Sequence, residues 1–322
     1  MSASQAIEKT QLHPRNKHRA LYAFDELIKS DPMLAKFVSL NKYNNLSIDF
    51  SDPAAVKELN KALLQYYYGI DHWDIPKNYL CPPIPGRADH IHYLADLLAS
   101  CNNGIIPLNK NVRCLDIGTG ANCIYPIIGN KEYGWQFVGT ETDTTAIRSA
   151  KRIIAANASL STNVVIRQQN DPEYIFRGII QSSETFDVSI CNPPFHTSLA
   201  EAQKGTMRKV NNLGTKKIGN PILNFGGQNA ELWCKGGESG FIARMIRESS
   251  DIKTSCFWFT SLVSKSANLR GIYNELKKVE PFEIRTIDMA QGNKTSRIVA
   301  WTYLNSAQQL AWREKRWHPT KK

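Results

Sequence analysis

The chain has no apolar run long enough to cross a membrane, and its first residues, MSASQAIEKTQ, lack the apolar segment of a secretory signal. We therefore predict a cytoplasmic protein. Cysteine is sparse, with seven scattered residues among 322 and no C-x-x-C pair. This usage disfavours both disulfides and a structural zinc, so no metal site is predicted.

Acidic residues are outnumbered: 29 Asp and Glu stand against 40 Lys and Arg, for a net charge of +11. The excess favours a polyanionic partner, although many soluble proteins are basic without binding nucleic acid. The length allows one large domain with an appendage, and 42% hydrophobic residues is typical of a soluble globular protein. We predict a basic arm and helical module over 1–87, a main domain over 88–308 and a basic tail over 309–322.

The N-terminal module opens with an arm that contains Arg15, Lys17 and Arg19. These residues are candidates for phosphate contacts, and a solvated terminus is the alternative. Helices are predicted over 20–29, 31–40 and 52–68, the last capped by Ser51 or Asp52. A proline-dense stretch, 75–87, reads as a rigid connection, and another helix is predicted over 88–101.

The main domain begins with a predicted buried strand, 112–117, that runs into Gly118-Thr119-Gly120. A strand, a G-x-G turn and a helix open a nucleotide-binding α/β unit. A dinucleotide site is disfavoured because Cys123 occupies the position of the third glycine. The next strand, 135–140, ends at Glu141, which can accept hydrogen bonds from both ribose hydroxyls. Asp143 is the rival for that role, with helix capping as its alternative.

Strands and helices continue to alternate. Further strands are predicted over 163–167, 186–190, 254–263, 282–289 and 297–304, and further helices over 144–158, 172–181 and 267–279. A glycine-containing hairpin at 291–294 makes the last two strands antiparallel. The turns at Gly118, Glu141 and Asn192 follow parallel strands, and open α/β sheets bind ligands at those carboxyl ends.

Asn192-Pro193-Pro194-Phe195 follows the strand 186–190. Asn192 is held extended because a proline follows it, and the two prolines remove two N–H donors. The amide oxygen of Asn192 and the carbonyl of Pro193 can then accept both hydrogens of a flat NH2 group while the ring of Phe195 stacks on its plane. The exocyclic amine of adenine fits this description. A Pro-Pro turn that only caps the strand is the alternative.

A long insertion, 202–230, follows this motif and contains five basic residues and no acid. Connections of this length are usually functional lids or disordered segments, and we expect a lid that grips RNA phosphates. Its basic residues are Lys204, Arg208, Lys209, Lys216 and Lys217. The tail, 312–322, is expected to be a surface extension.

Three motifs in this order, D-I-G-T-G, T-E-T-D and N-P-P-F, resemble those of class I S-adenosylmethionine-dependent methyltransferases. The resemblance implies an α/β, Rossmann-like fold, with a mostly parallel seven-stranded sheet and an antiparallel last strand. Together with H-P-R-N-K-H-R and I-P-G-R-A-D-H-I-H, the motifs are similar, over about 13–304, to the bacterial large-subunit (23S) ribosomal RNA adenine N6-methyltransferases and their eukaryotic relatives acting on small nuclear RNA.

The resemblance implies direct methyl transfer from S-adenosyl-L-methionine to the N6 amine of a specific unpaired or flipped adenine, without a general base. Expected partners are 23S ribosomal RNA or a pre-ribosomal particle, and the protein is expected to be a monomer. The implied cofactor residues are Arg87, Asp116, Gly118, Gly120, Asn122, Glu141 and Asn192. The end of the third strand, 168–171, does not show which residue contacts the cofactor's adenine.

Two other functions remain open. A protein glutamine N5-methyltransferase shares the N-P-P motif because a carboxamide is also a flat NH2, but the basic arm and insertion disfavour it. A non-enzymatic RNA-binding or ribosome-assembly module is disfavoured because Gly118, Gly120, Glu141, Asn192 and Phe195 are all intact.

Overall fold

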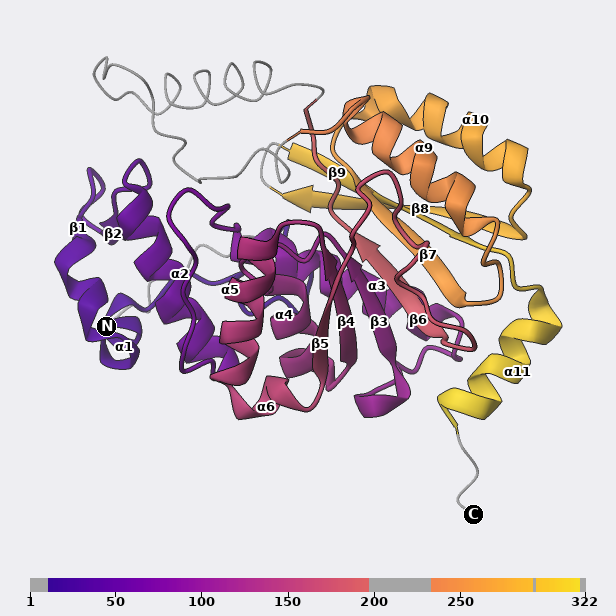
Figure 1. The fold of residues 1–322 in the computed structure, drawn as a ribbon. Coiled ribbons are helices and arrows are strands. Elements are labelled where there is room, and N and C mark those ends of the chain that lie inside the picture. The colour runs from indigo at the N-terminus through magenta and orange to yellow at the C-terminus, as the bar shows by residue number, and fades with distance from the viewer. Residues whose placement is uncertain (1–10, 197–232, 292–293, 319–322) are drawn as a thin grey trace.

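A computed structural model describes residues 11–196, 233–291 and 294–318. Its centre is a seven-stranded sheet of order β5-β4-β3-β6-β7-β9-β8 (Figure 1). The strands are β3 Arg113–Ile117, β4 Gln136–Glu141, β5 Val164–Gln168, β6 Phe186–Cys191, β7 Cys256–Val263, β8 Glu283–Gln291 and β9 Lys294–Thr302. β9 runs antiparallel to both its neighbours, and the other pairings are parallel. The predicted sheet is confirmed.

Helices cover both faces of this sheet (Figure 1). One face packs on α3 Ile84–Ser100, α4 Ile124–Tyr133, α5 Thr144–Ala155 and the short α6 Ala158–Ser161; the other packs on α9 Gly237–Ser249 and α10 Leu269–Val279. Successive side chains of β3 point to opposite faces of the sheet. Cys114 therefore belongs to the hydrophobic core on the first face and Leu115 to the core on the second. Within the described ranges, no helix combines the length and the apolar character needed to cross a bilayer.

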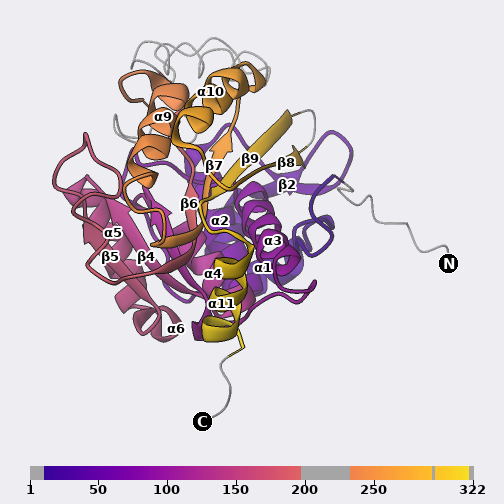
Figure 2. The same cartoon turned by 90° about the vertical axis from the view of Figure 1, so that its right-hand side faces the viewer.

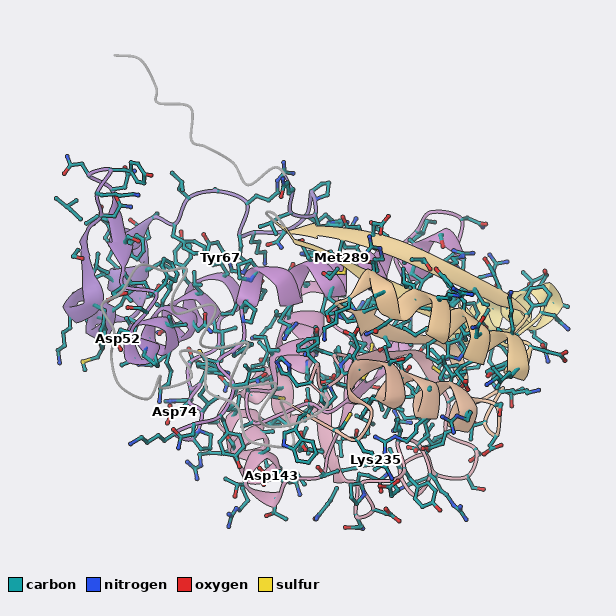
Figure 3. All side chains as sticks on the ribbon, turned by 90° about the horizontal axis from the view of Figure 1, so that it is seen from above. Asp52, Tyr67, Asp74, Asp143, Lys235 and Met289 are labelled. Carbon is teal, nitrogen blue, oxygen red and sulfur yellow. The ribbon has the colours of Figure 1, made fainter. Side chains whose placement is uncertain are left out.

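The N-terminal module packs on the first face. It contains α1 Phe24–Ser30, the 3-10 helix η1 Pro32–Phe37, the hairpin of β1 Val38–Leu40 with β2 Leu46–Ile48, and α2 Pro53–Tyr68. Figure 3 shows Asp52, at the start of α2, far from Met289 of β8. Buried side chains of α2 and of the main domain form one continuous core, so packing is not interrupted at residue 87.

Of two helices predicted in this module, one is confirmed and the other is only partly correct. The helix expected over 52–68 is confirmed, with the Asp52 carboxylate accepting a hydrogen bond of 2.8 Å from the Ala54 N–H. The helix expected over 31–40 is a 3-10 helix as far as Phe37 and is wrong over Val38–Leu40, which form β1. The Asn41 side chain accepts hydrogen bonds from the N–H groups of Tyr43 and Asn45 and reverses the chain into the β1–β2 hairpin.

Two further segments differ from expectation. Residues 84–87 are the first turn of α3 rather than part of a connection, since Pro85 is tolerated where a helix has no use for its N–H. The helix expected over 172–181 is absent. The N–H groups of Ile175 and Phe176 donate instead to the Glu248 carboxylate of α9, at 2.8 to 3.0 Å, which satisfies the backbone without a helix.

The part of the tail that the structure describes, up to residue 318, is not a surface extension. Helix α11, Ser306–Arg316, lies against the end of the sheet (Figure 2). Trp317, which follows it, is buried. The fully buried carboxylate of Asp187 in β6 accepts hydrogen bonds from Trp312, Arg316 and Trp317 at 2.6 to 3.0 Å. A buried carboxylate needs such donors, and the tail supplies them.

Candidate active site

A cavity opens at the carboxyl ends of the central strands, with about 930 Å³ of empty space that is partly open to solvent. Six of the predicted cofactor residues line it: Arg87, Gly118, Gly120, Asn122, Glu141 and Asn192. The structure therefore brings residues from α3 and three strand ends into one site, and their roles as cofactor ligands remain predictions.

The glycine turn after β3 forms the floor of the cavity. Gly118 and Gly120 have φ values of 70° and 65°, in the left-handed region that glycine adopts without a steric penalty. The turn is fixed to β4 by a hydrogen bond of 2.9 Å from the Thr119 N–H to the Thr140 carbonyl. Gly139 permits this contact, because a Cβ there would lie 3.0 Å from the Cβ of Thr119. A glycine inside a strand is typical of such a close approach.

Glu141 is buried at the end of β4 and joins two loops. Its Oε1 accepts hydrogen bonds from the N–H groups of Thr142 and Asp143, at 2.7 and 3.1 Å. Its Oε2 accepts one from the Gly120 N–H at 3.1 Å. A carboxylate has about four acceptor positions, so Oε2 keeps one position for a ligand hydroxyl.

Asp143, the rival for ribose binding, is otherwise engaged. Its Oδ1 caps α5 by accepting a hydrogen bond of 2.8 Å from the Thr145 N–H, and its Oδ2 accepts one from the Tyr79 hydroxyl. Asp143 is also absent from the cavity lining. The geometry favours Glu141 as the ribose acceptor.

Asp116 lies in β3, one residue before the cavity-lining Ile117. Its carboxyl group is buried, and neither oxygen has a hydrogen-bond partner among the described residues. Burial raises the pKa of Asp116 to about 7; the nearby Thr119 hydroxyl opposes this shift, and the Glu141 carboxylate adds to it. An unsatisfied polar group behind the glycine turn, together with Glu141 and the cationic Arg87, fits a ligand with hydroxyl and zwitterionic groups such as S-adenosylmethionine.

The N-P-P-F segment lies at one wall of the cavity. Asn192 and Pro194 line it, and the Asn192 Oδ1 accepts a hydrogen bond of 3.3 Å from Nη1 of Arg87. Pro193 is buried and Phe195 is half-buried, and neither belongs to the lining. The expected roles of the Pro193 carbonyl and the Phe195 ring therefore stay predictions.

Sequence reasoning missed several residues of the cavity wall. Gln169, just after β5, is the residue of 168–171 that reaches it, with its amide fixed by hydrogen bonds to the Arg177 carbonyl and the Asp171 N–H. Other unforeseen lining residues are Leu80, Pro82, Tyr125, Pro172, Tyr174, Ile175 and Phe241. Leu80 and Pro82 come from a loop without periodicity, and Pro172, Tyr174 and Ile175 from a segment whose helical pattern was misleading.

The predicted RNA-binding residues fall into two groups. The arm is docked rather than solvated: Arg15 forms an ion pair of 2.6 Å with Asp96, and Lys17 one of 2.9 Å with Glu132. Arg19 donates to the Pro14 carbonyl at 3.5 Å. Their contact with RNA remains a prediction.

The five basic residues Lys204, Arg208, Lys209, Lys216 and Lys217 lie outside the described residues. His196 and Trp233, the described residues on either side of this segment, lie next to each other in space because they form a β-bridge. Both ends lie next to the N-P-P-F segment.

This strand order, with a ligand cavity at the glycine turn, is that of the class I S-adenosylmethionine-dependent methyltransferases. A family described as RNA methyltransferase matches residues 6–305, and the chain belongs to this family.

Curated relatives match almost end to end. The chain is 55% identical over 311 residues to the ribosomal RNA large subunit methyltransferase F of Yersinia enterocolitica, covering 96% of this chain and 93% of the relative. It is 56% identical over 311 residues to the protein of the same name from Cytophaga hutchinsonii, with 97% of each chain covered.

Solved structures agree with this membership. The human METTL16 catalytic domain in complex with MAT2A 3'UTR hairpin 1 has a TM-score of 0.76 and 27% identity, covering 91% of this chain and 96% of that domain. The N-terminal domain of human METTL16 in complex with SAH has a TM-score of 0.71 and 25% identity, covering 91% and 99%. The protein is an S-adenosylmethionine-dependent RNA methyltransferase.

Proposed function

We propose that the protein methylates N6 of one specific unpaired or flipped adenine in 23S ribosomal RNA. The observation that carries the proposal is that Asn192 of N-P-P-F lines the same cavity as Glu141 and the glycine turn. A side-chain acceptor for a flat amine thus borders the cofactor cavity. The names of the curated relatives, which specify ribosomal RNA of the large subunit, support the choice of substrate.

The reaction depends more on aligning the amine with the methyl group than on activating either of them. Bound S-adenosylmethionine supplies a methyl group already activated on a sulfonium, whereas the N6 lone pair of adenine is delocalised into the ring. The Asn192 amide oxygen and the Pro193 carbonyl accept the two hydrogens of the amine and direct its lone pair. Such alignment can contribute about 7 to 11 kcal/mol to lowering the barrier. The nitrogen becomes acidic once methylated, so its proton passes to water and no side chain serves as a general base.

The amine of a paired, stacked adenine cannot reach this wall, so the base enters unpaired or flipped. Stacking on Phe195 then contributes roughly 1 to 3 kcal/mol to holding it. In the cofactor site, Glu141 binds the ribose, while Arg87, Asp116, Asn122 and the glycine turn surround the remaining polar groups. The basic residues of 202–230 bind RNA phosphates, and the protein acts as a cytoplasmic monomer on 23S RNA or a pre-ribosomal particle.

The test combines purified protein, labelled S-adenosylmethionine and large-subunit RNA, followed by digestion to nucleosides and mass spectrometry. We expect N6-methyladenosine from one site. Methyl transfer to the glutamine of a peptide-chain release factor, with none to RNA, would support the protein-methylating alternative. A protein that fails to bind S-adenosylhomocysteine in calorimetry would instead be a non-enzymatic RNA-binding module.

A further inference from the structure

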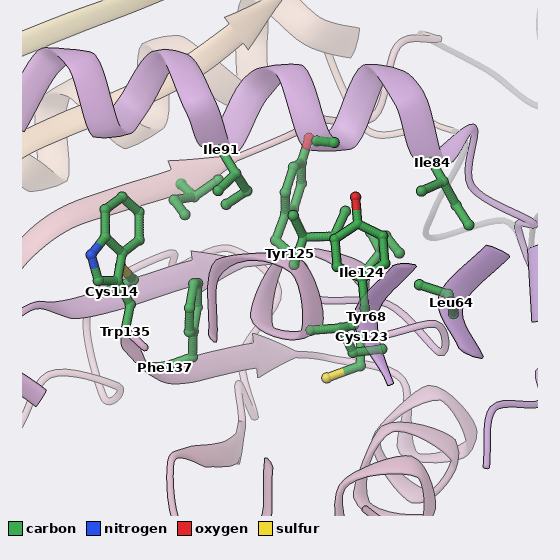
Figure 4. Packing of buried hydrophobic residues seen from close by; sticks show 14 of the residues in the cluster. Leu64, Tyr68, Ile84, Ile91, Cys114, Cys123, Ile124, Tyr125, Trp135 and Phe137 are labelled. Atoms are coloured by element: carbon green, nitrogen blue, oxygen red, sulfur yellow. The ribbon is translucent and has the colours of Figure 1, made fainter. Parts of the chain in front are cut away.

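Two histidines of α3 each contact a tyrosine of α4 in the same way. The Nδ1 atom of His90 shares a hydrogen bond of 2.9 Å with the Tyr125 hydroxyl, and Nδ1 of His92 shares one of 2.7 Å with the Tyr133 hydroxyl. The rings meet edge to face in both pairs, at 89° and 86°. Figure 4 shows Tyr125 between the two helices with its hydroxyl directed at α3.

Only the first pair borders the cavity. Tyr125 lines it, and the guanidinium carbon of Arg87 lies 5.6 Å from the centroid of the Tyr125 ring. Arg87 then donates to Oδ1 of Asn192 at 3.3 Å. Tyr133 instead accepts a hydrogen bond from Nε of Arg15 and is absent from the lining. A continuous set of contacts thus runs from His90 through Tyr125 and Arg87 to Asn192.

The protonation states of the first pair do not change around neutral pH. Burial lowers the pKa of His90 to about 3, with a smaller contribution from the nearby Arg87. Burial raises the pKa of Tyr125 to about 12. The histidine is therefore neutral and the tyrosine keeps its proton, so the aromatic face beneath Arg87 stays uncharged and fixed.

The contact between Arg87 and Asn192 decides how the amide can serve the reaction. An asparagine side chain can present either its oxygen or its NH2, and only the oxygen accepts a hydrogen bond from an amine. A guanidinium has donors and no acceptor, so Arg87 selects the orientation in which Oδ1 faces it. The oxygen has two lone pairs, and the second remains for the amine of the target base.

We propose that Tyr125, held by His90, is a positioning residue that acts through Arg87 to keep the Asn192 amide in its acceptor orientation. The inference rests on the proposed adenine N6-methylation. It adds a residue that contacts neither the target amine nor Glu141, and whose loss slows transfer more than it weakens cofactor binding.

The first test compares Tyr125→Leu and Tyr125→Phe with the matched control Tyr133→Leu in single-turnover methyl transfer at saturating RNA and cofactor. We expect Tyr125→Leu to slow transfer roughly 5- to 30-fold and Tyr125→Phe, which keeps the ring, about threefold. Tyr133→Leu should lower thermal stability and leave the rate nearly unchanged. Calorimetry should show a smaller loss of affinity for S-adenosylhomocysteine than of rate for Tyr125→Leu, because Tyr125 lines the cofactor cavity, and an affinity within about threefold of wild type for Tyr133→Leu.

The second test repeats the Tyr125 variants in an Asn192→Asp background, where both side-chain atoms are acceptors and orientation no longer matters. Tyr125→Leu should then lose most of its effect, and so should Tyr125→Phe if the leucine variant does not fold. An equal loss in both backgrounds, or a loss of cofactor affinity as large as the loss of rate, overturns the inference. Failure of the proposed function is distinct, because the wild-type protein would then form no N6-methyladenosine.

Discussion

The carboxylate of Glu141 accepts a hydrogen bond of 3.1 Å from the backbone N–H of Gly120, which lies in the turn after the neighbouring strand. One side chain thus holds the glycine turn and also keeps an acceptor position for a ligand. The acidic residue at the end of β4 therefore shapes the cavity in addition to any contact with ribose.

Glu141→Ala should weaken S-adenosylhomocysteine binding by at least about tenfold, because it removes a ligand acceptor and leaves three N–H groups without a partner. Asp143→Ala is the control. It removes a helix cap, at about 1 kcal/mol of stability, and the acceptor of the Tyr79 hydroxyl, but no residue of the cavity lining, so the affinity should stay nearly unchanged. Calorimetric titration distinguishes them, and the opposite ranking would transfer the ribose role to Asp143.

Asp116 makes stability depend on pH. Its pKa is raised to about 7 by burial, so the folded protein holds this proton more tightly than the unfolded chain does. Protonated Asp116 makes its full contribution to the free energy of unfolding below about pH 4. This contribution, up to about 4 kcal/mol, is lost as the pH rises to about 7.

Asp116→Asn removes this titration and should gain stability relative to wild type over that interval. Denaturant unfolding of both proteins at a series of pH values measures the difference. The titration of His90 and His92, whose pKa values burial lowers to about 3, cancels in the comparison. Parallel pH profiles would show that Asp116 is ionised throughout in the folded protein.

The docking of α11 depends on Asp187. Asp187→Ala leaves the Arg316 guanidinium and two indole N–H groups without their buried acceptor, and should cost about 3 to 5 kcal/mol in urea unfolding. Glu275→Ala is the comparison, because the half-buried Glu275 pairs with the exposed cations Lys278 and Arg247 and should cost less than about 1 kcal/mol. Equal costs would contradict the assigned role of the tail.

If the basic insertion binds phosphates, neutralising Lys204, Arg208 and Lys209 should flatten the salt dependence of RNA binding. The expected change is roughly two to three units of log–log slope, at about 0.7 to 0.9 per phosphate contact. A control removes the same charge from the exposed Arg148, Lys151 and Arg152 of α5. Equal flattening in both would show an effect of net charge alone.

The ends of the sheet strands were the most predictable part of the molecule. The buried runs before Gly118, Glu141 and Asn192 are long and bounded by turn residues, and these positions meet at one cavity as expected. Local chemistry was enough here because parallel strands place their carboxyl ends at a common edge.

What could not be predicted depends on partners distant in sequence. The segment 172–181 is periodic enough for a helix, but Glu248 satisfies its N–H groups from α9. The tail has a basic composition typical of a surface, yet the indoles of Trp312 and Trp317 donate hydrogen bonds to the buried Asp187 carboxylate. Arg15 and Lys17 likewise form ion pairs with Asp96 and Glu132, and the sequence alone does not reveal these pairings.

The central claim is that Asn192 positions the amine of the target adenine, and Asn192→Ala tests it most directly. The substitution removes one acceptor and leaves the strand, both prolines and the glycine turn in place, so folding and RNA affinity should survive. Single-turnover methyl transfer at saturating RNA and cofactor should fall about 10²- to 10³-fold, with a smaller loss of cofactor affinity. A variant that transfers methyl groups at nearly the wild-type rate would contradict the account and leave N-P-P-F as the cap of a strand.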